Sequence, residues 1–344
     1  MFKNVWAMLC GVLLFLGGMS SANAELKVGM VFDIGGRGDQ SFNDSAYRGL
    51  EWATDAFGIT HIEIEPGADA DRESGLRMVA GQGFDLIIGV GFLFADSMTA
   101  VAKEFPNTKF AIVDGVIPDL PNVSSLTFIE NDGSFLVGVM AGMKAKADGK
   151  DTLGFVGGMD VPLIHKFNAG YREGIKYTCP ECKLLSDYAG STPQAFADPV
   201  KGKELALAQI DKGAHVIYQA AGLTGMGVYE ACKERKTLVI GTDSNQNYLA
   251  NIKETGENFG LTSMLKQVDV AVYLTIQDVL DGKFQAGVRS FGLAETVTIQ
   301  DVTYHGVYYA MDEYNKALVT PEMIEKVTEA EQKIIAKEIV VPQE

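Results

Sequence analysis

The stretch LKVGMVFDIGGRGDQSFNDSAYRGLEWATDAF, residues 26–57, decides the fold of this chain. Its apolar run at residues 28–32 has the length and the β-branched side chains of a buried strand. A loop rich in glycine and polar side chains follows, and apolar side chains then recur at helical spacing from Ala46 to Phe57. A strand, a glycine-rich loop and a helix in this order predict the opening of an α/β sheet domain.

The start of this helix carries a capping signal. Ser41 and Asp44 are three residues apart, which resembles a capping box. Ligands of open α/β sheets bind beyond the carboxyl ends of the strands. The loop after the first strand therefore offers a ligand five side chains, namely Asp33, Asp39, Ser41, Phe42 and Asn43.

The first 24 residues are predicted to be a signal peptide that is not part of the fold. Lys3 is followed by an apolar run at residues 5–18 and by small residues at 22–24 that suit a cleavage site. The apolar run is too short for a comfortable membrane span, so we expect export and cleavage after Ala24. Cys10 would serve as a lipid anchor only with an unusually short leader.

Length and charge narrow the possible functions. The chain has 344 residues, enough for two domains, and a formal net charge of −16. Loss of Lys3 with the signal peptide makes the mature chain one unit more negative. Because nucleic acids and anionic lipid surfaces attract clustered lysine and arginine, this composition argues against both as partners.

Three cysteines lie after the predicted cleavage site. Cys179 and Cys182 form a C-x-x-C pair, which in an exported protein predicts a local disulfide. A thioredoxin-type redox centre and half of a zinc site are the alternatives, but nothing thioredoxin-like surrounds the pair and no second pair exists. Cys232, on an amphipathic helix, is interpreted as a buried free thiol.

Strands and helices alternate in two similar series. The first has predicted strands at residues 28–32, 61–64, 85–90, 109–113 and 123–129, and helices at 71–82 and 95–105 besides the opening one. The second has strands at 153–156, 184–188, 215–219 and 238–240, and helices at 135–146, 164–177, 201–212 and 225–235. The remainder has a helix at 268–280, short strands within 291–309, and helices at 312–317 and 321–337. Repeated β-α units with apolar strands predict mostly parallel sheets covered on both faces.

Polar residues and glycines follow the ends of these strands. Asp33, Gly91 and Asp114 follow strands of the first series, and Asp243 follows the last strand of the second. Residues 220–224 follow another strand of the second series. Two such edges that face each other form a cleft, which predicts a site for a small polar ligand.

Enzyme motifs are weak or missing. No G-x-S-x-G or H-E-x-x-H occurs, and the loop at residues 35–38 lacks the Lys-Ser/Thr of a P-loop. The best enzyme alternative is a nicotinamide site at residues 222–227, with Asp243 about 20 residues on, but the glycine order is wrong. The four histidines are scattered. We therefore expect no catalysis, no cofactor and no metal.

Two aromatic residues stand in predicted loops. Phe42 lies between polar residues, a poor place for the core and a good one for stacking on a flat ligand. Phe196 is a loop aromatic of the other half, and two rings closing on one planar group would account for both, at about 0.5–1.5 kcal/mol per stacked pair. Alternatively, Phe196 packs in a local cluster. Lys266, at the start of the long helix, could face the cleft, although periodicity alone makes it a solvated lysine.

Several long motifs resemble one known family. They are Asp33-x-Gly35, Asp39-x-Ser41-Phe42-Asn43, GVGFLFADSM (89–98), FAIVDG (110–115), GFVGGMD (154–160), YQAAG-TG-GV (218–228), and GTDSNQNYL with LTSMLKQVDVAVY (241–273). Over residues 27–292 the chain resembles the basic membrane protein family of ABC-transporter substrate-binding proteins, and within it the purine nucleoside receptors.

The resemblance implies a type I periplasmic-binding-protein fold, in which two doubly wound α/β lobes joined by three crossings enclose a ligand. The expected lobes are residues 25–128 with about 262–283, and residues 129–261 with about 284–344.

The resemblance also implies roles for the candidate residues. The base is expected to stack between Phe42 and Phe196, and Asp39 and Asn43 are expected to read its edge. The ribose hydroxyls are expected to meet an Asp and a Lys, here Asp243 and Lys266, with Gly222 against the sugar. Asp114 is the family's carboxylate after the fourth strand. Asp33, Ser41 and Gly91 complete the predicted site.

Two departures from the family pattern bear on these expectations. The loop around Phe196 is longer than usual, and the leader lacks a convincing lipobox, which implies a soluble protein in a Gram-negative periplasm.

We expect a monomer that delivers a purine nucleoside to the permease of an ABC importer. The alternatives are a sugar or an autoinducer-like ligand in the same fold, or a sensor component that presents its ligand to a membrane receptor.

Overall fold

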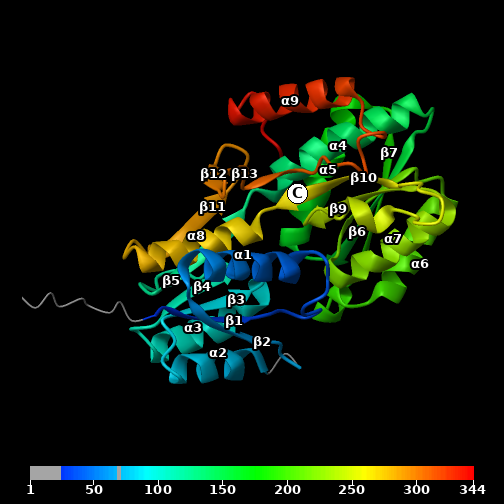
Figure 1. The fold of residues 1–344 in the computed structure, drawn as a ribbon. Coiled ribbons are helices and arrows are strands. Elements are labelled where there is room, and N and C mark those ends of the chain that lie inside the picture. The colour runs from blue at the N-terminus through cyan, green and yellow to red at the C-terminus, as the bar shows by residue number, and fades with distance from the viewer. Residues whose placement is uncertain (1–24, 68–70) are drawn as a thin grey trace, which may run out of the picture.

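The computed structural model describes residues 25–67 and 71–344, so the predicted signal peptide lies outside the described residues. Two lobes, each built on a six-stranded sheet, lie side by side (Figure 1). Among the described residues, no helix combines the length and the hydropathy that crossing a membrane requires.

The first lobe contains a sheet with the strand order β2-β1-β3-β4-β5-β11. Its strands are β1 (Lys27–Val31), β2 (Thr60–Ile64), β3 (Leu86–Val90), β4 (Lys109–Val113), β5 (Val123–Phe128) and β11 (Gly287–Phe291), all parallel. Its helices are α1 (Phe42–Phe57), α2 (Asp71–Gly81), α3 (Ala95–Glu104) and α8 (Val268–Leu280). Helices α1 and α8 pack on one face of the sheet and α2 and α3 on the other.

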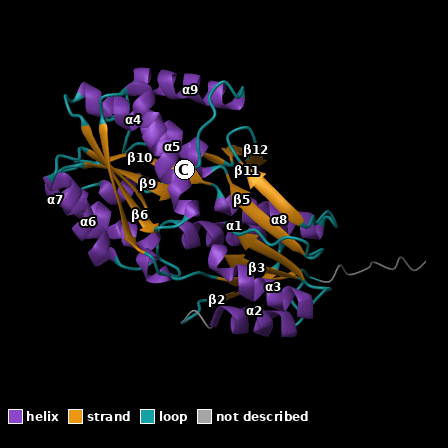
Figure 2. Ribbon diagram, turned by 180° about the vertical axis from the view of Figure 1, so that it is seen from behind, coloured by secondary structure: helices purple, strands orange, loops and turns teal. Residues whose placement is uncertain are grey.

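The second lobe repeats this design, with the strand order β7-β6-β8-β9-β10-β14. Its strands are β6 (Thr152–Met159), β7 (Lys183–Gly190), β8 (Val216–Ala220), β9 (Leu238–Asp243), β10 (Gly260–Lys266) and the antiparallel β14 (Val307–Tyr309). Its helices are α4 (Glu130–Ala147), α5 (Pro162–Thr178), α6 (Pro199–Asp211), α7 (Gly225–Arg235) and α9 (Pro321–Ile335). Figure 2 shows both sheets from behind, with helices on either side of each.

Burial on both faces explains why the strands are so apolar. Along β1, Val28 and Met30 face the core beneath α1, while Val31 faces the core beneath α2, and all three are fully buried. The core beneath α1 continues through the junction of the lobes into α4 and α5. The two lobes therefore share one apolar core.

The chain passes between the two sheets three times, from β5 to α4, from β10 to α8, and from β11 to β14. A small hairpin of β12 (Thr296–Ile299) and β13 (Val302–His305) interrupts the third passage. The lobe limits expected near residues 262 and 283 differ from this division, because β10 pairs with β9 of the second sheet and β11 pairs with β5 of the first.

Two sequence-based expectations about local structure are wrong. Lys266 does not start a helix but ends β10, a strand that the periodicity did not reveal. Residues 312–317 are turns and not a helix. The Asp312 side chain accepts hydrogen bonds from the backbone N–H groups of Tyr314 and Asn315, and the Lys316 N–H donates to the Asp312 carbonyl oxygen. The segment therefore forms a capped turn that does not continue as a helix.

Candidate ligand-binding site

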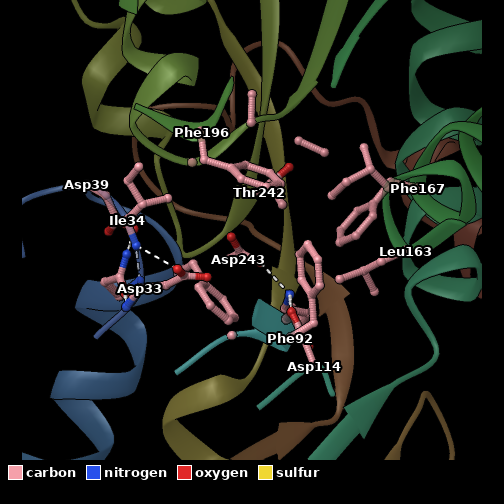
Figure 3. Close-up of a pocket in the computed structure, with 18 residues that line it drawn as sticks. Asp33, Ile34, Asp39, Phe92, Asp114, Leu163, Phe167, Phe196, Thr242 and Asp243 are labelled. Carbon is pink, nitrogen blue, oxygen red and sulfur yellow. Dashed lines mark hydrogen bonds and ion pairs between the residues drawn. The ribbon is translucent and has the colours of Figure 1, made fainter. Parts of the chain in front are cut away.

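A cavity lies between the lobes, at the carboxyl ends of the strands. Its empty volume is about 580 Å³, including space that opens to solvent. The lining residues are Asp33, Ile34, Asp39, Phe42, Asn43, Gly91, Phe92, Asp114, Leu163, Ile164, Phe167, Phe196, Ala220, Ala221, Gly222, Thr242, Asp243 and Lys266. Figure 3 shows the Asp33 loop on one side of the cavity, with Leu163 and Phe167 of α5 on the opposite side. The strand order places this cavity where doubly wound sheets bind ligands.

A buried charge cluster forms the floor of the cavity. The Lys266 Nζ atom lies 2.6 Å from Asp114 Oδ2 and 3.2 Å from Asp243 Oδ1. Asp114 follows β4 of the first lobe, whereas Asp243 ends β9 and Lys266 ends β10 of the second. The three side chains are at most 7% exposed. The ion pair therefore joins the two lobes.

The cluster keeps its lysine charged and leaves acceptors unused. Burial alone lowers the pKa of Lys266, but the nearby carboxylates, led by Asp114 and Asp243, outweigh burial and raise it. Burial raises the pKa of Asp114, and Lys266 offsets part of that shift. Within the described residues, Asp114 Oδ1 accepts no hydrogen bond, and Asp243 Oδ1 has only its ion pair with Lys266. Buried carboxylate oxygens that can accept further hydrogen bonds are suited to ligand hydroxyl groups.

The backbone aims these two carboxylates. Asp114 has a φ of 62° and Asp243 a φ of 66°, both in the left-handed region. Such conformations are uncommon for residues other than glycine, and Asp tolerates them better than most. Each strand thus ends in a turn that carries an acidic side chain. Strained backbone of this kind is frequent at ligand sites.

Aromatic rings surround the lysine. The Lys266 Nζ atom lies 4.6 Å from the centroid of the Phe42 ring and 5.4 Å from that of Phe167. Both distances fall in the range of cation–π attraction. Phe92 of the first lobe contacts Phe196 of the second edge-on, with centroids 6.5 Å apart. The cavity therefore combines apolar rings with a few buried polar groups, as small-molecule sites do.

Asp39 caps helix α1, which corrects the predicted capping box. Its carboxylate accepts hydrogen bonds from the backbone N–H groups of Ser41, Asn43 and Asp44 and from the Asn43 side chain. The Ser41 hydroxyl makes no capping bond. Burial raises the pKa of Asp39 to about 6, although these backbone donors oppose the shift.

Ser41 is buried but does not line the cavity. Its hydroxyl lies 2.7 Å from Asp243 Oδ2 and 3.0 Å from the Thr242 carbonyl oxygen. It therefore links the first lobe to the carboxylate of the second, rather than standing as a lining residue.

Glycines shape the walls around Asp33. The Asp33 Oδ1 atom accepts from the guanidinium of Arg72 at 3.0 Å, inside the first lobe. Gly91 has a φ of 117° and a ψ of 151°, a conformation almost confined to glycine, and a Cβ there would stand 2.3 Å from Asp33 Oδ2. Gly222 has a φ of 56° and lies against Phe196.

The structure brings ten of the eleven predicted ligand-binding residues to this one cavity, all but Ser41. Sequence reasoning missed Phe92, which follows Gly91 directly, and the α5 residues Leu163, Ile164 and Phe167. The position of Phe92 just after a strand was a usable signal. The α5 side chains have the spacing of a helix that faces a core, and the sequence pattern cannot distinguish that position from one at the cavity.

The cysteines stand as predicted. Cys179 and Cys182 form a disulfide, which joins the end of α5 to the start of β7. Cys232 is a buried free thiol, and burial raises its pKa. In the described part of the chain, no three His, Cys, Asp or Glu side chains gather as a metal ion would require.

Comparison with known proteins identifies the family. Residues 26–344 match the family model Bmp, described as ABC transporter substrate-binding protein PnrA-like. The chain belongs to this family. The predicted family is thereby confirmed, and the chain is a substrate-binding protein of the ABC-transporter type, a class of solute-binding proteins and not of enzymes.

Individual relatives and solved structures of similar proteins agree with this family assignment. The chain is 34% identical over 341 residues to the ABC transporter nucleoside-binding protein BmpA of Lactococcus lactis, covering 95% of this chain and 92% of that protein. A crystal structure of an ABC transporter solute-binding protein from Aeropyrum pernix K1 is 31% identical, with a TM-score of 0.80 over 93% of this chain and 94% of that one.

More distant structures show the same fold. A carbohydrate transporter solute-binding protein from Agrobacterium radiobacter, solved with D-arabinose, is 16% identical, with a TM-score of 0.61 over 89% of this chain and 99% of that one. The predicted type I periplasmic-binding-protein fold is confirmed.

Proposed function

We propose that this Bmp family protein captures a purine nucleoside between its two lobes and delivers it to the permease of an ABC importer. The observation that carries the proposal is the cavity floor. Among the described residues, Asp114 Oδ1 accepts no hydrogen bond, and Asp243 Oδ1 has only the charged Lys266 ammonium beside it, at 3.2 Å. Hydroxyl groups of a ribose supply the missing donors, and lysine donates to the oxygen that remains.

Aromatic walls suit the base. The rings of Phe42 and Phe196 are two of four phenylalanine rings that line the cavity, together with Phe92 and Phe167. A planar purine between such rings gains both buried area and stacking. The nucleoside-binding name of the Lactococcus lactis relative supports this class of ligand. In this proposal Asp39 and Asn43 contribute to the wall beside the base.

The setting of the function follows from the leader and the family. Export and cleavage after Ala24 would place the mature protein in the periplasm, where permease subunits of the inner membrane are its partners. Ligand contacts on both lobes would favour the closed arrangement, since a ligand shifts a hinge equilibrium by its extra affinity for one state.

Thermal unfolding of the mature protein tests the class of ligand. The protein is unfolded and refolded to remove carried ligand and then heated with adenosine, guanosine, inosine, cytidine, uridine, adenine, ribose or glucose. A ligand at a thousand times its dissociation constant adds about 4 kcal/mol of stability. We expect shifts of the midpoint with purine nucleosides alone. A flat response to every nucleoside together with a shift for a sugar would overturn the function and leave the fold.

Two substitutions test the assigned roles by calorimetry. Asp243→Asn keeps a residue that tolerates the left-handed backbone but removes the charge, so nucleosides should bind about 10–100-fold more weakly while free adenine changes little. Equal losses for adenosine and adenine would show that Asp243 does not hold the ribose. Phe42→Ala should weaken nucleosides and free bases alike, because it removes a stacking surface that both use.

A further inference from the structure

The charge cluster extends beyond the cavity lining to a second acid. Glu130 is the first residue of α4, where the chain first passes from one lobe to the other, and it is 1% exposed. Its Oε2 atom lies 3.2 Å from Lys166 Nζ of α5. It does not line the cavity. Its carboxyl nevertheless interacts with Asp114 and with Lys266.

The cluster holds more acids than bases. Three carboxyl groups, those of Asp114, Glu130 and Asp243, share two ammonium groups, those of Lys166 and Lys266. With every group ionised the cluster, in which the Lys166 side chain alone is partly exposed, has one negative charge in excess. A buried charge without a partner is costly, and the group takes up a proton instead.

Among the described residues, the charged groups that act on Glu130 are Asp114, Lys166 and Lys266, and the titratable groups of the other elements packed on α4 have partners of their own. Asp132, on α4 itself, interacts with Glu295. Tyr309 of β14 and Glu331 of α9 interact with each other, and β6 carries no titratable side chain. The Tyr218 hydroxyl of β8 lies 3.0 Å from Ser134 Oγ. Lys266 interacts with both Asp243 and Glu130 and so connects these two acids.

Lobe opening changes this cluster. Asp114 belongs to the first lobe, whereas Lys166, Lys266 and Asp243 belong to the second. Hinge opening therefore moves Asp114 away and lets water reach the other groups. A solvated carboxyl of glutamic acid returns toward its ordinary pKa of 4.5, whereas burial in the closed cluster raises the pKa of Glu130 to about 7.

We propose that Glu130 is a positioning residue that couples lobe closure, and with it ligand binding, to the uptake of one proton by the buried cluster. The inference rests on the proposed function, because the ligand's binding reports closure. A group that holds a proton more tightly in the closed form favours closure at low pH. Affinity should rise as the pH falls below about 7, by up to about tenfold per pH unit, and should be constant above it.

Calorimetric titration with adenosine, and with guanosine and inosine in parallel, tests the proposal between about pH 5.5 and pH 8.5. Two buffers of different ionisation heat report the protons taken up. The wild type should take up close to one proton at the acidic end and none at the alkaline end. Glu130→Gln imitates the protonated acid, so its affinity should be independent of pH and, at alkaline pH, about tenfold or more above that of the wild type.

A second variant acts in the opposite direction. Lys166→Gln removes a positive charge, so the cluster should keep its proton to higher pH and the fall in affinity should move to higher pH. Glu173→Gln, a matched control on the surface of α5 next to Lys176 and Arg172, should keep the wild-type profile. Because Lys166→Gln and Glu173→Gln should give different pH profiles of affinity, they test the proposal even if Glu130→Gln does not fold.

Three results separate the possible failures. If Glu130→Gln keeps the slope of the wild type, another acid such as Asp39 takes up the proton and the inference is wrong. If nucleosides bind with the same affinity at every pH, the inference is wrong and the proposed function stands. If no nucleoside binds at any pH while a sugar does, the proposed function fails and the inference falls with it.

Discussion

At residue 91 the backbone, rather than a side chain, serves the site. Gly91 adopts a conformation nearly confined to glycine, beside the Asp33 carboxylate that Arg72 holds. It lines the cavity through its main chain, directly before Phe92. A candidate ligand-binding glycine can thus matter because it leaves room for its neighbours.

Gly91→Ala should therefore lower stability and weaken ligand binding together, because the new Cβ must displace Asp33. Gly83→Ala is the matched control, since Gly83 also has a positive φ, of 75°, but no described atom lies within 4 Å of the added Cβ. The control should cost only the backbone strain, about 1–2 kcal/mol, with unchanged affinity. Denaturant unfolding and calorimetry measure both effects, and equal losses in the two variants would contradict the argument.

At the scale of elements, helix α5 has two ends with different tasks. Leu163, Ile164 and Phe167 near its start line the cavity, whereas Cys179 and Cys182 tie its end to β7. Between them the helix packs closely on α4, where a Cβ on Gly174 would stand 2.1 Å from the Phe135 carbonyl oxygen. This packing, rather than the disulfide, positions the start of α5.

Reduction of the disulfide should consequently lower the free energy of unfolding by about 2 kcal/mol, the order expected for so short a loop, and leave ligand affinity within about twofold. Thermal unfolding with and without dithiothreitol measures the first effect and calorimetry the second. A double variant, Cys179→Ser with Cys182→Ser, should lose the response to the reductant. A large loss of affinity on reduction would show that the two ends of α5 are coupled.

At the scale of the whole molecule, buried acids set an unusual pH dependence. Burial raises the pKa of Glu130 to about 7 and those of Asp39 and Asp132 to about 6. A carboxyl with a raised pKa in the folded state stabilises the fold below its ordinary pKa and loses that contribution as the pH rises through the raised value. Surface pairs act oppositely: hydrogen bonds from Lys326 and Lys333 lower the pKa of Glu329 to about 2.

The free energy of unfolding of the unliganded protein should thus be higher near pH 5 than near pH 8, by an amount on the order of a few kcal/mol. The negative net charge acts in the same direction, because self-repulsion weakens as acids take up protons. Urea unfolding at both pH values measures the difference. A more stable protein at pH 8 would mean that these acids are ionised and well paired in the folded state.

The sequence by itself determined most of the elements and the chemistry at their ends, with the strand β10 and the turn at 312–317 as exceptions. Periods of hydrophobicity are local, so they identified parallel strands such as residues 28–32 and helices such as 268–280, which the structure confirms. Family motifs then pointed to Phe42, Asp243 and Lys266, and all three line the cavity. Strand ends of parallel sheets meet at one edge, so acids and glycines at those ends could be assigned to a cleft.

Only the tertiary structure decided how these residues act on one another. Ser41 bonds to Asp243 across 202 positions of the chain, Asp39 caps α1 in its place, and Glu130 joins the charge cluster from the first crossing. Such contacts depend on two lobes closing around a shared core, and no local pattern records which strand ends come to face each other. Burial then sets the charge of each acid, because desolvation acts on a group only where the fold has placed it.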